Sequence, residues 1–141
     1  MSLNVCIFGV SGYTGSKLLY FLNRHKNINI HGIFGKTTKG QNLRNLFPKM
    51  KNLPNILISD YLEFNFSNTD LIFSCLPHGE FQQEIIFNLD DKIPIIDLSG
   101  DFRLNDILEY EYFYKTKHKS KKKFNRFVYG LSEIYKNEII K

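Results

Sequence analysis

The sequence contains no alanine, no tryptophan and no long uninterrupted apolar run. Because a helix needs about 20 consecutive apolar residues to cross a bilayer, we expect no membrane span. Only 9 Gly and 4 Pro occur among 141 residues, which excludes a collagen-like or linker composition. The 13 Phe and 8 Tyr exclude an intrinsically disordered chain, so the composition predicts one folded domain.

Cysteine is scarce as well. Cys6 and Cys75 both lie in apolar runs, which is typical of buried free thiols in a reducing compartment rather than of a disulfide framework. The first apolar run begins at residue 3, which leaves no room for a signal or transit peptide, so we expect a cytoplasmic protein. The four histidines lack the spacing of metal ligands, and no metal site is predicted.

Acidic residues are absent from residues 115–126, which carry seven basic residues. The whole chain has 19 basic and 14 acidic residues, so the remainder has 12 basic and 14 acidic residues and a net charge of −2. A solvated surface loop explains such a run, and we do not expect binding to nucleic acid or to a membrane. A nucleic-acid-binding patch is the alternative, and its affinity would fall steeply with salt.

Short apolar runs alternate with helical patterns along the first hundred residues. Strands are predicted at residues 4–9, 29–34, 55–59, 69–76 and 94–98. Helices are predicted at 14–24, 80–89 and 105–114, and a strand or extended piece at 127–131. This alternation indicates βαβ units and therefore an α/β fold, a doubly wound, mostly parallel sheet covered on both faces.

A glycine-rich turn lies between the first predicted strand and the first predicted helix. Gly9 permits a tight turn, Gly12 lets the backbone approach a pyrophosphate, and Gly15 lets the helix pack closely on the sheet. Unpaired N–H groups at the start of the helix then face the phosphates. This context predicts a Rossmann-like dinucleotide site, with a purely structural turn as the alternative. The predicted contacts are Gly9, Ser11, Gly12, Tyr13, Thr14 and Gly15.

The end of the second predicted strand bears on the choice between NAD and NADP. NAD sites place an acidic residue there, which accepts the ribose 2′-hydroxyl. Residues 34–40 carry two lysines, two threonines and no acid. We therefore predict that Lys36, Thr37 and Thr38 contact the 2′-phosphate of NADP or NADPH. The alternative is that Lys36 and Lys39 are only solvated turn residues.

Three later loops follow predicted strands or lie near the end of the chain, where a ligand of such a sheet could reach them. Residues 76–79 are Leu-Pro-His-Gly, a turn whose backbone can lie along a cofactor. Residues 97–103 place two acids, a hydroxyl and Arg103 in one loop, and residues 128–133 form the third loop. An arginine there suits bidentate recognition of a phosphate or carboxylate, and a salt bridge to Asp97 or Asp101 is the alternative.

Four motifs, in this order, resemble N-acetyl-gamma-glutamyl-phosphate reductase, an NADPH-dependent enzyme of arginine biosynthesis related to aspartate-semialdehyde dehydrogenase. They are Gly-Val-Ser-Gly-Tyr-Thr-Gly at 9–15, Leu-Pro-His-Gly at 76–79, Asp-Leu-Ser-Gly-Asp-Phe-Arg-Leu at 97–104 and Val-Tyr-Gly-Leu-Ser-Glu at 128–133. The chain departs from the family pattern in three places. Gly100 stands for a small alanine, Ser132 stands for a proline, and Lys36 and the threonines after it stand for an arginine followed by hydroxyl residues.

The resemblance implies an oxidoreductase that reduces N-acetyl-glutamyl 5-phosphate to the 5-semialdehyde. A cysteine would attack the acyl phosphate, and NADPH would pass hydride to the resulting thioester. By the same resemblance, the 76–79 turn lines the nicotinamide side of the cofactor, Ser99 contacts the cofactor, and Arg103 holds the substrate phosphate. The cofactor contacts in that turn are Leu76, Pro77, His78 and Gly79.

The family's nucleophilic cysteine and catalytic histidine follow the fourth motif and are not among residues 1–141. We therefore expect residues 1–141 to be an NAD(P)-binding domain, truncated before the substrate domain, with no catalytic residue and no turnover of its own. Cys75 is expected to be a structural thiol rather than a partner of His78. We expect the full-length enzyme to be a homo-oligomer. A reductase of aspartyl or aminoadipyl phosphate and a non-catalytic NADP-binding module remain as alternatives.

Overall fold

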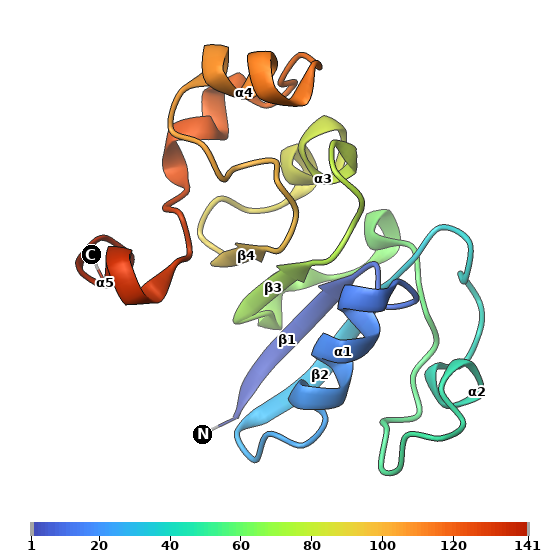
Figure 1. Ribbon diagram of the computed structural model, residues 1–141. Coiled ribbons are helices and arrows are strands. Elements are labelled where there is room, and N and C mark those ends of the chain that lie inside the picture. Colours follow the sequence, from blue (N-terminus) through green and yellow to red (C-terminus); the bar gives the residue numbers. More distant parts are fainter. Residues whose placement is uncertain (1, 141) are drawn as a thin grey trace. The chain divides into compact units, whose positions relative to one another are not determined.

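The computed structural model describes residues 2–140 and contains a parallel sheet of four strands (Figure 1). The strands are β1 (Leu3–Phe8), β2 (Ile28–Phe34), β3 (Leu71–Ser74) and β4 (Ile95–Asp97). Their order is β2-β1-β3-β4, and all three neighbouring pairs are parallel. The chain runs from β1 outward to β2 and then returns past β1 to β3, so the predicted doubly wound, Rossmann-like α/β fold is confirmed.

The chain divides into two compact units. Unit 1 contains the residues up to Leu76 together with Leu89–Leu98, and it holds the whole sheet with α1 (Tyr13–Leu22) and α2 (Leu43–Leu46). Unit 2 contains Pro77–Asn88 and the residues from Ser99 onward. Its helices are α3 (Glu80–Gln83), α4 (Ile107–Tyr114) and α5 (Ser132–Ile139).

One face of the sheet packs on α1 through aliphatic side chains. Val5 and Ile7 of β1 alternate along the strand and share a buried cluster with Leu19, which lies on the inner face of α1. Ile30 and Ile33 belong to the same cluster although they are three residues apart. Both can face α1 because the β1–β2 register shifts between Val5 and Cys6, a bulge that changes the alternation of β2.

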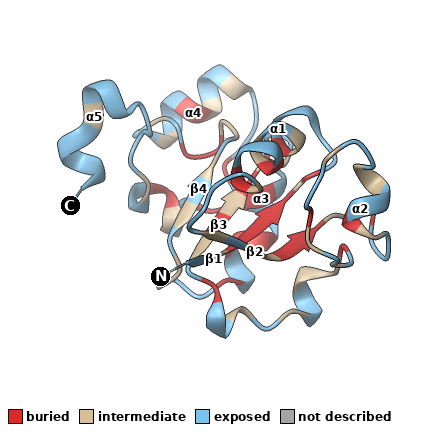
Figure 2. Ribbon diagram, turned by 90° about the horizontal axis from the view of Figure 1, so that it is seen from below, coloured by how far each residue is buried: buried red, intermediate tan, exposed pale blue. Residues whose placement is uncertain are grey.

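Aromatic side chains cover the opposite face. The ring centroids of Phe8 and Phe34 lie 4.6 Å apart, and Phe34 contacts Phe64 and Phe66 at 5.0 and 5.4 Å. Those two rings come from the 3-10 turns Tyr61–Glu63 and Phe66–Asn68 and their flanks. Figure 2 shows that buried residues line β1 and β2.

Several local predictions differ from the structure. Residues 55–59 do not form a strand: Ser59 makes a parallel bridge to Phe34 and Leu57 an antiparallel bridge to Asn42, so no single ladder can grow. The helix predicted at 80–89 ends early, because Glu84 leaves helical geometry and a 3-10 turn follows. Residues 127–131 are in no strand, and the pattern did not indicate α2 or α5.

Both cysteines are free thiols, as predicted, with Cys6 buried and Cys75 half-buried. Within the part of the chain that the structure describes, no helix combines the length and the apolar character that a bilayer crossing would require.

Candidate functional site

The glycine turn begins where β1 ends. Gly9 has a φ of +78°, a left-handed conformation that favours glycine, and its N–H donates to the Phe34 carbonyl at 3.0 Å. A Cβ on Gly9 would lie 2.8 Å from the Cys75 carbonyl oxygen. The turn therefore lies against the carboxyl end of β3, at the point between β1 and β3 where the strand order reverses. Ligands of doubly wound sheets bind at this switch point.

Gly15 and Gly12 are glycines for different reasons. A Cβ on Gly15 would lie 2.2 Å from the Gly9 carbonyl oxygen, so any side chain would push α1 away from the turn. A Cβ on Gly12 would make only an ordinary contact, 3.6 Å from the same oxygen. Packing inside the chain explains Gly15 but leaves Gly12 unexplained.

The start of α1 offers unoccupied backbone donors. Gly12 is the N-cap residue, and it has no side chain to accept a hydrogen bond from the first helical N–H groups. The first turn of α1 contains no acidic residue, and Ser11, Tyr13 and Thr14 are exposed. Such a helix start attracts an anion, because its N–H groups and its dipole both favour negative charge.

The loop after β2 contains one buried hydroxyl. Thr38 is 8% exposed, and its Oγ1 has no hydrogen-bond partner among the described residues. Buried hydroxyl groups are nearly always paired, so an unpaired one at a predicted ligand site is informative. Lys36 and Thr37 are exposed in the same loop. Lys39 forms an ion pair with Asp60 at 3.0 Å and is therefore not a simply solvated residue.

Asp60 is a charged residue near the carboxyl end of β2 that the sequence pattern did not indicate. The Ser59 N–H donates to the Ile33 carbonyl at 2.9 Å, so Asp60 follows a bridge beside the carboxyl end of β2. The Leu62 N–H and the Lys39 ammonium both bond to its carboxylate, and they lower the pKa of Asp60. The hydrogen bond to Asp60 raises the pKa of Lys39. An acid directly after the apolar 55–59 run was the available signal.

Leu76 lies beside the glycine turn. Its Cδ2 would be 3.1 Å from a Cβ on Gly9, and the Cys75 N–H donates to the Phe8 carbonyl at 3.0 Å. Burial, with a smaller effect of the Asp97 charge, raises the pKa of Cys75 to about 12, and burial raises that of Cys6 to about 11. Neither thiol forms a thiolate near neutral pH, which agrees with the prediction that both are structural.

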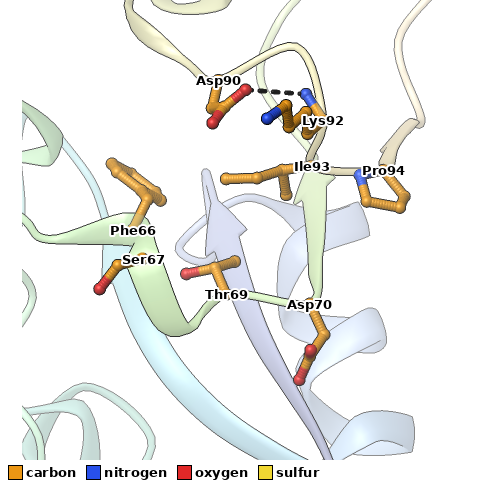
Figure 3. A pocket seen from close by; sticks show the side chains of 8 residues that line it. All are labelled: Phe66, Ser67, Thr69, Asp70, Asp90, Lys92, Ile93 and Pro94. Atoms are coloured by element: carbon orange, nitrogen blue, oxygen red, sulfur yellow. Dashed lines mark hydrogen bonds between the residues drawn. The ribbon is translucent and has the colours of Figure 1, made fainter.

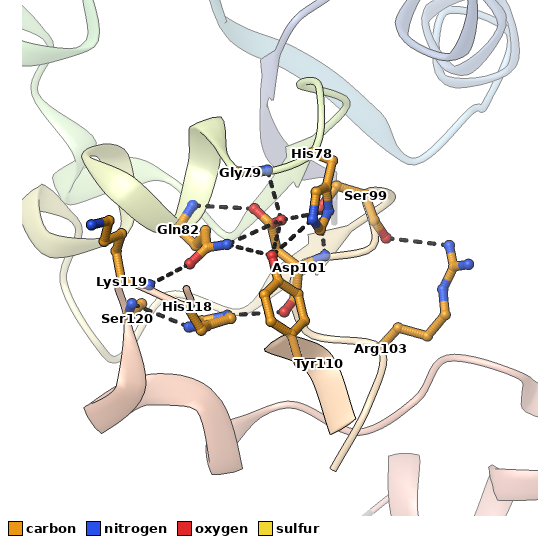
Figure 4. Close-up of polar contacts among 10 residues, drawn as sticks. All are labelled: His78, Gly79, Gln82, Ser99, Asp101, Arg103, Tyr110, His118, Lys119 and Ser120. Carbon is orange, nitrogen blue, oxygen red and sulfur yellow. Dashed lines mark hydrogen bonds and ion pairs between the residues drawn. The ribbon is translucent and has the colours of Figure 1, made fainter. Parts of the chain in front are cut away.

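The buried carboxylate of Asp101 accepts several hydrogen bonds within unit 2 (Figure 4). Asp101 is fully buried, and its Oδ1 accepts the Gly79 N–H at 2.7 Å and faces His78 Nδ1 at 2.9 Å. Its Oδ2 accepts the Gln82 N–H at 3.4 Å. Asp101, which belongs to the 97–104 motif, thus contacts His78 and Gly79 of the 76–79 motif. These contacts hold Gly79 at a φ of +92°.

The two ring nitrogens of His78 are both engaged. The Gln82 amide donates to the Tyr110 hydroxyl at 2.6 Å, so that hydroxyl can donate to His78 Nε2 at 2.8 Å. His78 Nδ1–H then donates to Asp101. The His78 ring also stacks on Tyr114, with centroids 4.3 Å apart. An imidazole bonded on both sides supports the turn.

His118 and Ser99 extend the network. His118 Nδ1 accepts the Ser120 N–H at 3.1 Å, so its Nε2–H donates to the Asp101 carbonyl at 2.9 Å. Burial lowers the pKa of His118. The Ser99 hydroxyl accepts the Asp101 N–H at 3.0 Å, and Arg103 donates to the Ser99 carbonyl at 3.4 Å. Arg103 is exposed and does not pair with Asp101, whose carboxylate faces His78 instead.

A separate hollow of about 410 Å³ lies in unit 1 (Figure 3). Its lining residues come from just before β3, just before β4 and the turns that precede them, so it belongs to the amino edge of the sheet. They are Phe66, Ser67, Thr69, Asp70, Asp90, Lys92, Ile93 and Pro94. None of them is a predicted site residue. Among residues 2–140, no cluster of His, Cys, Asp and Glu could hold a metal ion.

Named relatives match nearly all of this chain. It is 38% identical over 139 residues to N-acetyl-gamma-glutamyl-phosphate reductase of Cereibacter sphaeroides, with 99% of this chain and 40% of that protein covered. The Methanococcus vannielii reductase is also 38% identical over 139 residues, with 97% and 40% covered. A probable chloroplastic reductase of rice is 37% identical, with 97% and 33% covered. The chain therefore spans 33–40% of the length of these relatives.

A solved structure and a family match complete the comparison. Aspartate semialdehyde dehydrogenase with NADP from Candida albicans superimposes with a TM-score of 0.63 over 76% of this chain and 32% of that one, at 16% identity, which shows a common fold. Residues 4–141 match the family described as "Semialdehyde dehydrogenase, NAD binding domain". Because this match spans nearly the whole chain, the protein belongs to the semialdehyde dehydrogenase family, and these residues are its NAD(P)-binding domain.

Proposed function

We propose that the chain is the NADP-binding part of an N-acetyl-gamma-glutamyl-phosphate reductase. The enzyme would reduce N-acetyl-glutamyl 5-phosphate to the 5-semialdehyde with NADPH, and its nucleophilic cysteine and substrate domain would lie outside residues 1–141. The compartment proposed is the cytoplasm, and the full-length enzyme is proposed to be a homo-oligomer. The observation that carries the proposal is the glycine turn at the switch point of the sheet.

Gly12 is the most informative residue of that turn. A Cβ on Gly12 would make only an ordinary contact, 3.6 Å from the Gly9 carbonyl oxygen, so the chain itself does not require glycine there. A pyrophosphate resting on the backbone would require it, because a side chain would keep the phosphates away from the N–H groups of α1. The cofactor's diphosphate is accordingly assigned to residues 9–15.

The 2′-phosphate of NADP is assigned to the loop after β2. The unpaired Thr38 hydroxyl can donate to a phosphate oxygen, and the Lys36 ammonium supplies charge from the exposed side of the loop, beside Thr37. No acid occurs in residues 34–40 to accept a ribose hydroxyl. These three residues support NADPH over NADH as the cofactor.

The remaining assignments follow the order of the motifs. Leu76 lies beside Gly9, and the rigid Pro77–Gly79 turn that follows is assigned to the nicotinamide side, with Ser99 as a further contact. Arg103 has an exposed guanidinium and is assigned to the acyl phosphate of the substrate. The buried network around Asp101 keeps the backbone of both loops in place.

Calorimetry with the 141-residue chain tests the coenzyme assignment. NADPH is expected to bind at least about tenfold more tightly than NADH, a difference of about 1.4 kcal/mol. Gly12→Ala should abolish most of this binding without loss of stability. Gly130→Ala is the matched control, because a Cβ there meets nothing within 4 Å. Unchanged NADPH binding by Gly12→Ala would contradict the pyrophosphate assignment.

A chimaera tests the substrate. Residues 1–141 would replace the matching segment of the Methanococcus vannielii reductase, and the purified chimaera would be assayed with NADPH and N-acetyl-glutamyl 5-phosphate. Thiol-dependent formation of the semialdehyde is expected, whereas the isolated chain should show none. A chimaera that binds NADPH but reduces only aspartyl phosphate, or no acyl phosphate, would reject this substrate assignment.

A further inference from the structure

We propose that Lys39 selects the coenzyme indirectly, by neutralising Asp60, an acid that stands beside the strand end where NAD sites hold one. This inference rests on the proposed function, because it needs the coenzyme ribose to lie beside residues 36–38. Lys39 is then a specificity-determining residue without being a phosphate ligand.

The placement of Asp60 follows from hydrogen bonds that hold the edge of the sheet. The Ser59 bridge to Phe34 extends the sheet beside the end of β2, and Asp60 is the next residue along. The same segment holds the loop that follows β2: the Gly40 N–H donates to the Ile58 carbonyl at 2.8 Å, and the Ile58 N–H donates to the Gln41 carbonyl at 2.9 Å. The acid that residues 34–40 lack is therefore supplied from across the loop.

Both oxygens of the Asp60 carboxylate are occupied. Oδ1 accepts the Leu62 N–H at 3.1 Å, which caps the following 3-10 turn, and Oδ2 accepts a hydrogen bond from the Lys39 ammonium at 3.0 Å. Glu63 lies on the same ammonium at 3.7 Å. Lys39 is thus held by two carboxylates.

Removal of the Lys39 charge would act on the two coenzymes in opposite directions. Two carboxylates would face the doubly charged 2′-phosphate of NADPH without a counter-ion, and like charges brought together weaken binding. The freed Oδ2 of Asp60 would be an acceptor for the 2′-hydroxyl of NADH, which is the role of the acid in NAD sites. The ratio of the NADPH affinity to the NADH affinity therefore measures the effect of the Lys39 charge on coenzyme choice.

Four variants of the full chain separate an indirect role from a direct one. Lys39→Met should weaken NADPH binding about tenfold and strengthen NADH binding about threefold at low salt. Asp60→Asn keeps an oxygen for the Leu62 N–H and removes the charge. The Lys39→Met, Asp60→Asn double variant should bind NADPH within about threefold of the unmodified chain. Lys26→Met, an exposed lysine before β2, removes the same charge elsewhere and should leave the ratio unchanged.

The outcomes are distinct. If the double variant binds NADPH as poorly as Lys39→Met, the ammonium contacts the phosphate directly and the inference is wrong. An unchanged ratio in Lys39→Met would overturn it as well. If the unmodified chain binds neither coenzyme, the proposed function itself fails, whereas binding with a ratio insensitive to Lys39 rejects only this inference.

Discussion

The two units of the chain bury different kinds of side chain. The interior of unit 1 is mostly apolar, with aliphatic residues such as Val5, Ile7 and Leu19 on one face of the sheet and the buried rings of Phe8 and Phe34 on the other. The interior of unit 2 centres on Asp101 and its hydrogen-bond partners, surrounded by aromatic rings. Aliphatic packing tolerates changes that conserve volume, whereas a buried polar network stabilises only when every member has its partner. We therefore expect the loss of stability in unit 1 to grow with the volume removed, whereas the loss of a single polar partner should strongly destabilise unit 2.

The largest effect is expected from Asp101→Leu. The Gly79 and Gln82 N–H groups and the His78 ring would lose a buried acceptor, which we expect to cost unit 2 about 4 kcal/mol. Hydrogen exchange followed by mass spectrometry would locate the loss. Faster exchange in residues 77–88 and 107–114, with β1 and β2 unaffected, supports the comparison. Equal loosening of the sheet would show that the two units do not differ in this way.

Leu19→Ala is the corresponding change in unit 1. Leu19 is fully buried against the sheet, and its truncation should cost about 3 kcal/mol through lost packing and a cavity. Leu19→Met conserves volume and should cost about 1 kcal/mol. Urea unfolding would measure both. The contrast with unit 2 would be lost if Leu19→Met were as damaging as Leu19→Ala.

Acid should weaken unit 2 before unit 1. Burial lowers the pKa of His118 below its usual 6.5, so at pH values below 6.5 the unfolded chain takes up a proton that the folded chain resists. The contribution is complete above pH 6.5 and declines as the pH falls toward the folded pKa. Protonation at Nδ1 would also remove the acceptor for the Ser120 N–H. Amide exchange of unit 2, corrected for the intrinsic exchange rate, that accelerates as the pH falls below 6.5 would agree, and the His118→Gln variant should flatten that dependence.

The smallest effects on stability are expected from substitutions of two serines, Ser74 and Ser99. Ser74 is fully buried in β3 and its hydroxyl has no partner among residues 2–140, so Ser74→Ala should be neutral or stabilise the chain by up to about 1 kcal/mol. Ser99 accepts the Asp101 N–H, so Ser99→Ala should destabilise by about 1 kcal/mol. Thermal unfolding of the two variants would give the sign of each change. The two changes in stability should have opposite signs. A loss of stability in Ser74→Ala would contradict the prediction for the unpaired Ser74 hydroxyl.

Local patterns predicted the parts of the fold that depend on near neighbours. The apolar run of β1, the helical spacing of Leu19 and Leu22 and the glycine turn all lie within residues 3–22. The bulge in β2 could not be predicted, because the three-residue spacing of Ile30 and Ile33 breaks the strict alternation of a strand. The 55–59 run looked like a strand because it is apolar, and only the folded chain shows that its two bridges run in opposite directions.

The candidate site likewise contains segments that the local sequence predicted and contacts that it did not. The glycines, the 36–38 loop and the 76–79 turn were predicted from residue type and order, because a tight turn or a close backbone approach leaves few choices of residue. The partners of those segments were not found. Asp60 holds Lys39, and both ring nitrogens of His78 are engaged; no pattern along the chain indicated these contacts.

By itself, the amino-acid sequence determined the alternation of strands and helices and the backbone conformation of the glycine corner, because hydrophobic period and glycine geometry act over a few neighbouring residues. Tertiary structure alone decided which charges meet. Lys39 and Asp60 are 21 residues apart, and the backbone of Gly79 and the carboxylate of Asp101 are 22 apart. Hydrogen bonds and ion pairs act over about 3 Å and follow no period along the chain, so their partners exist only once the backbone has brought them together.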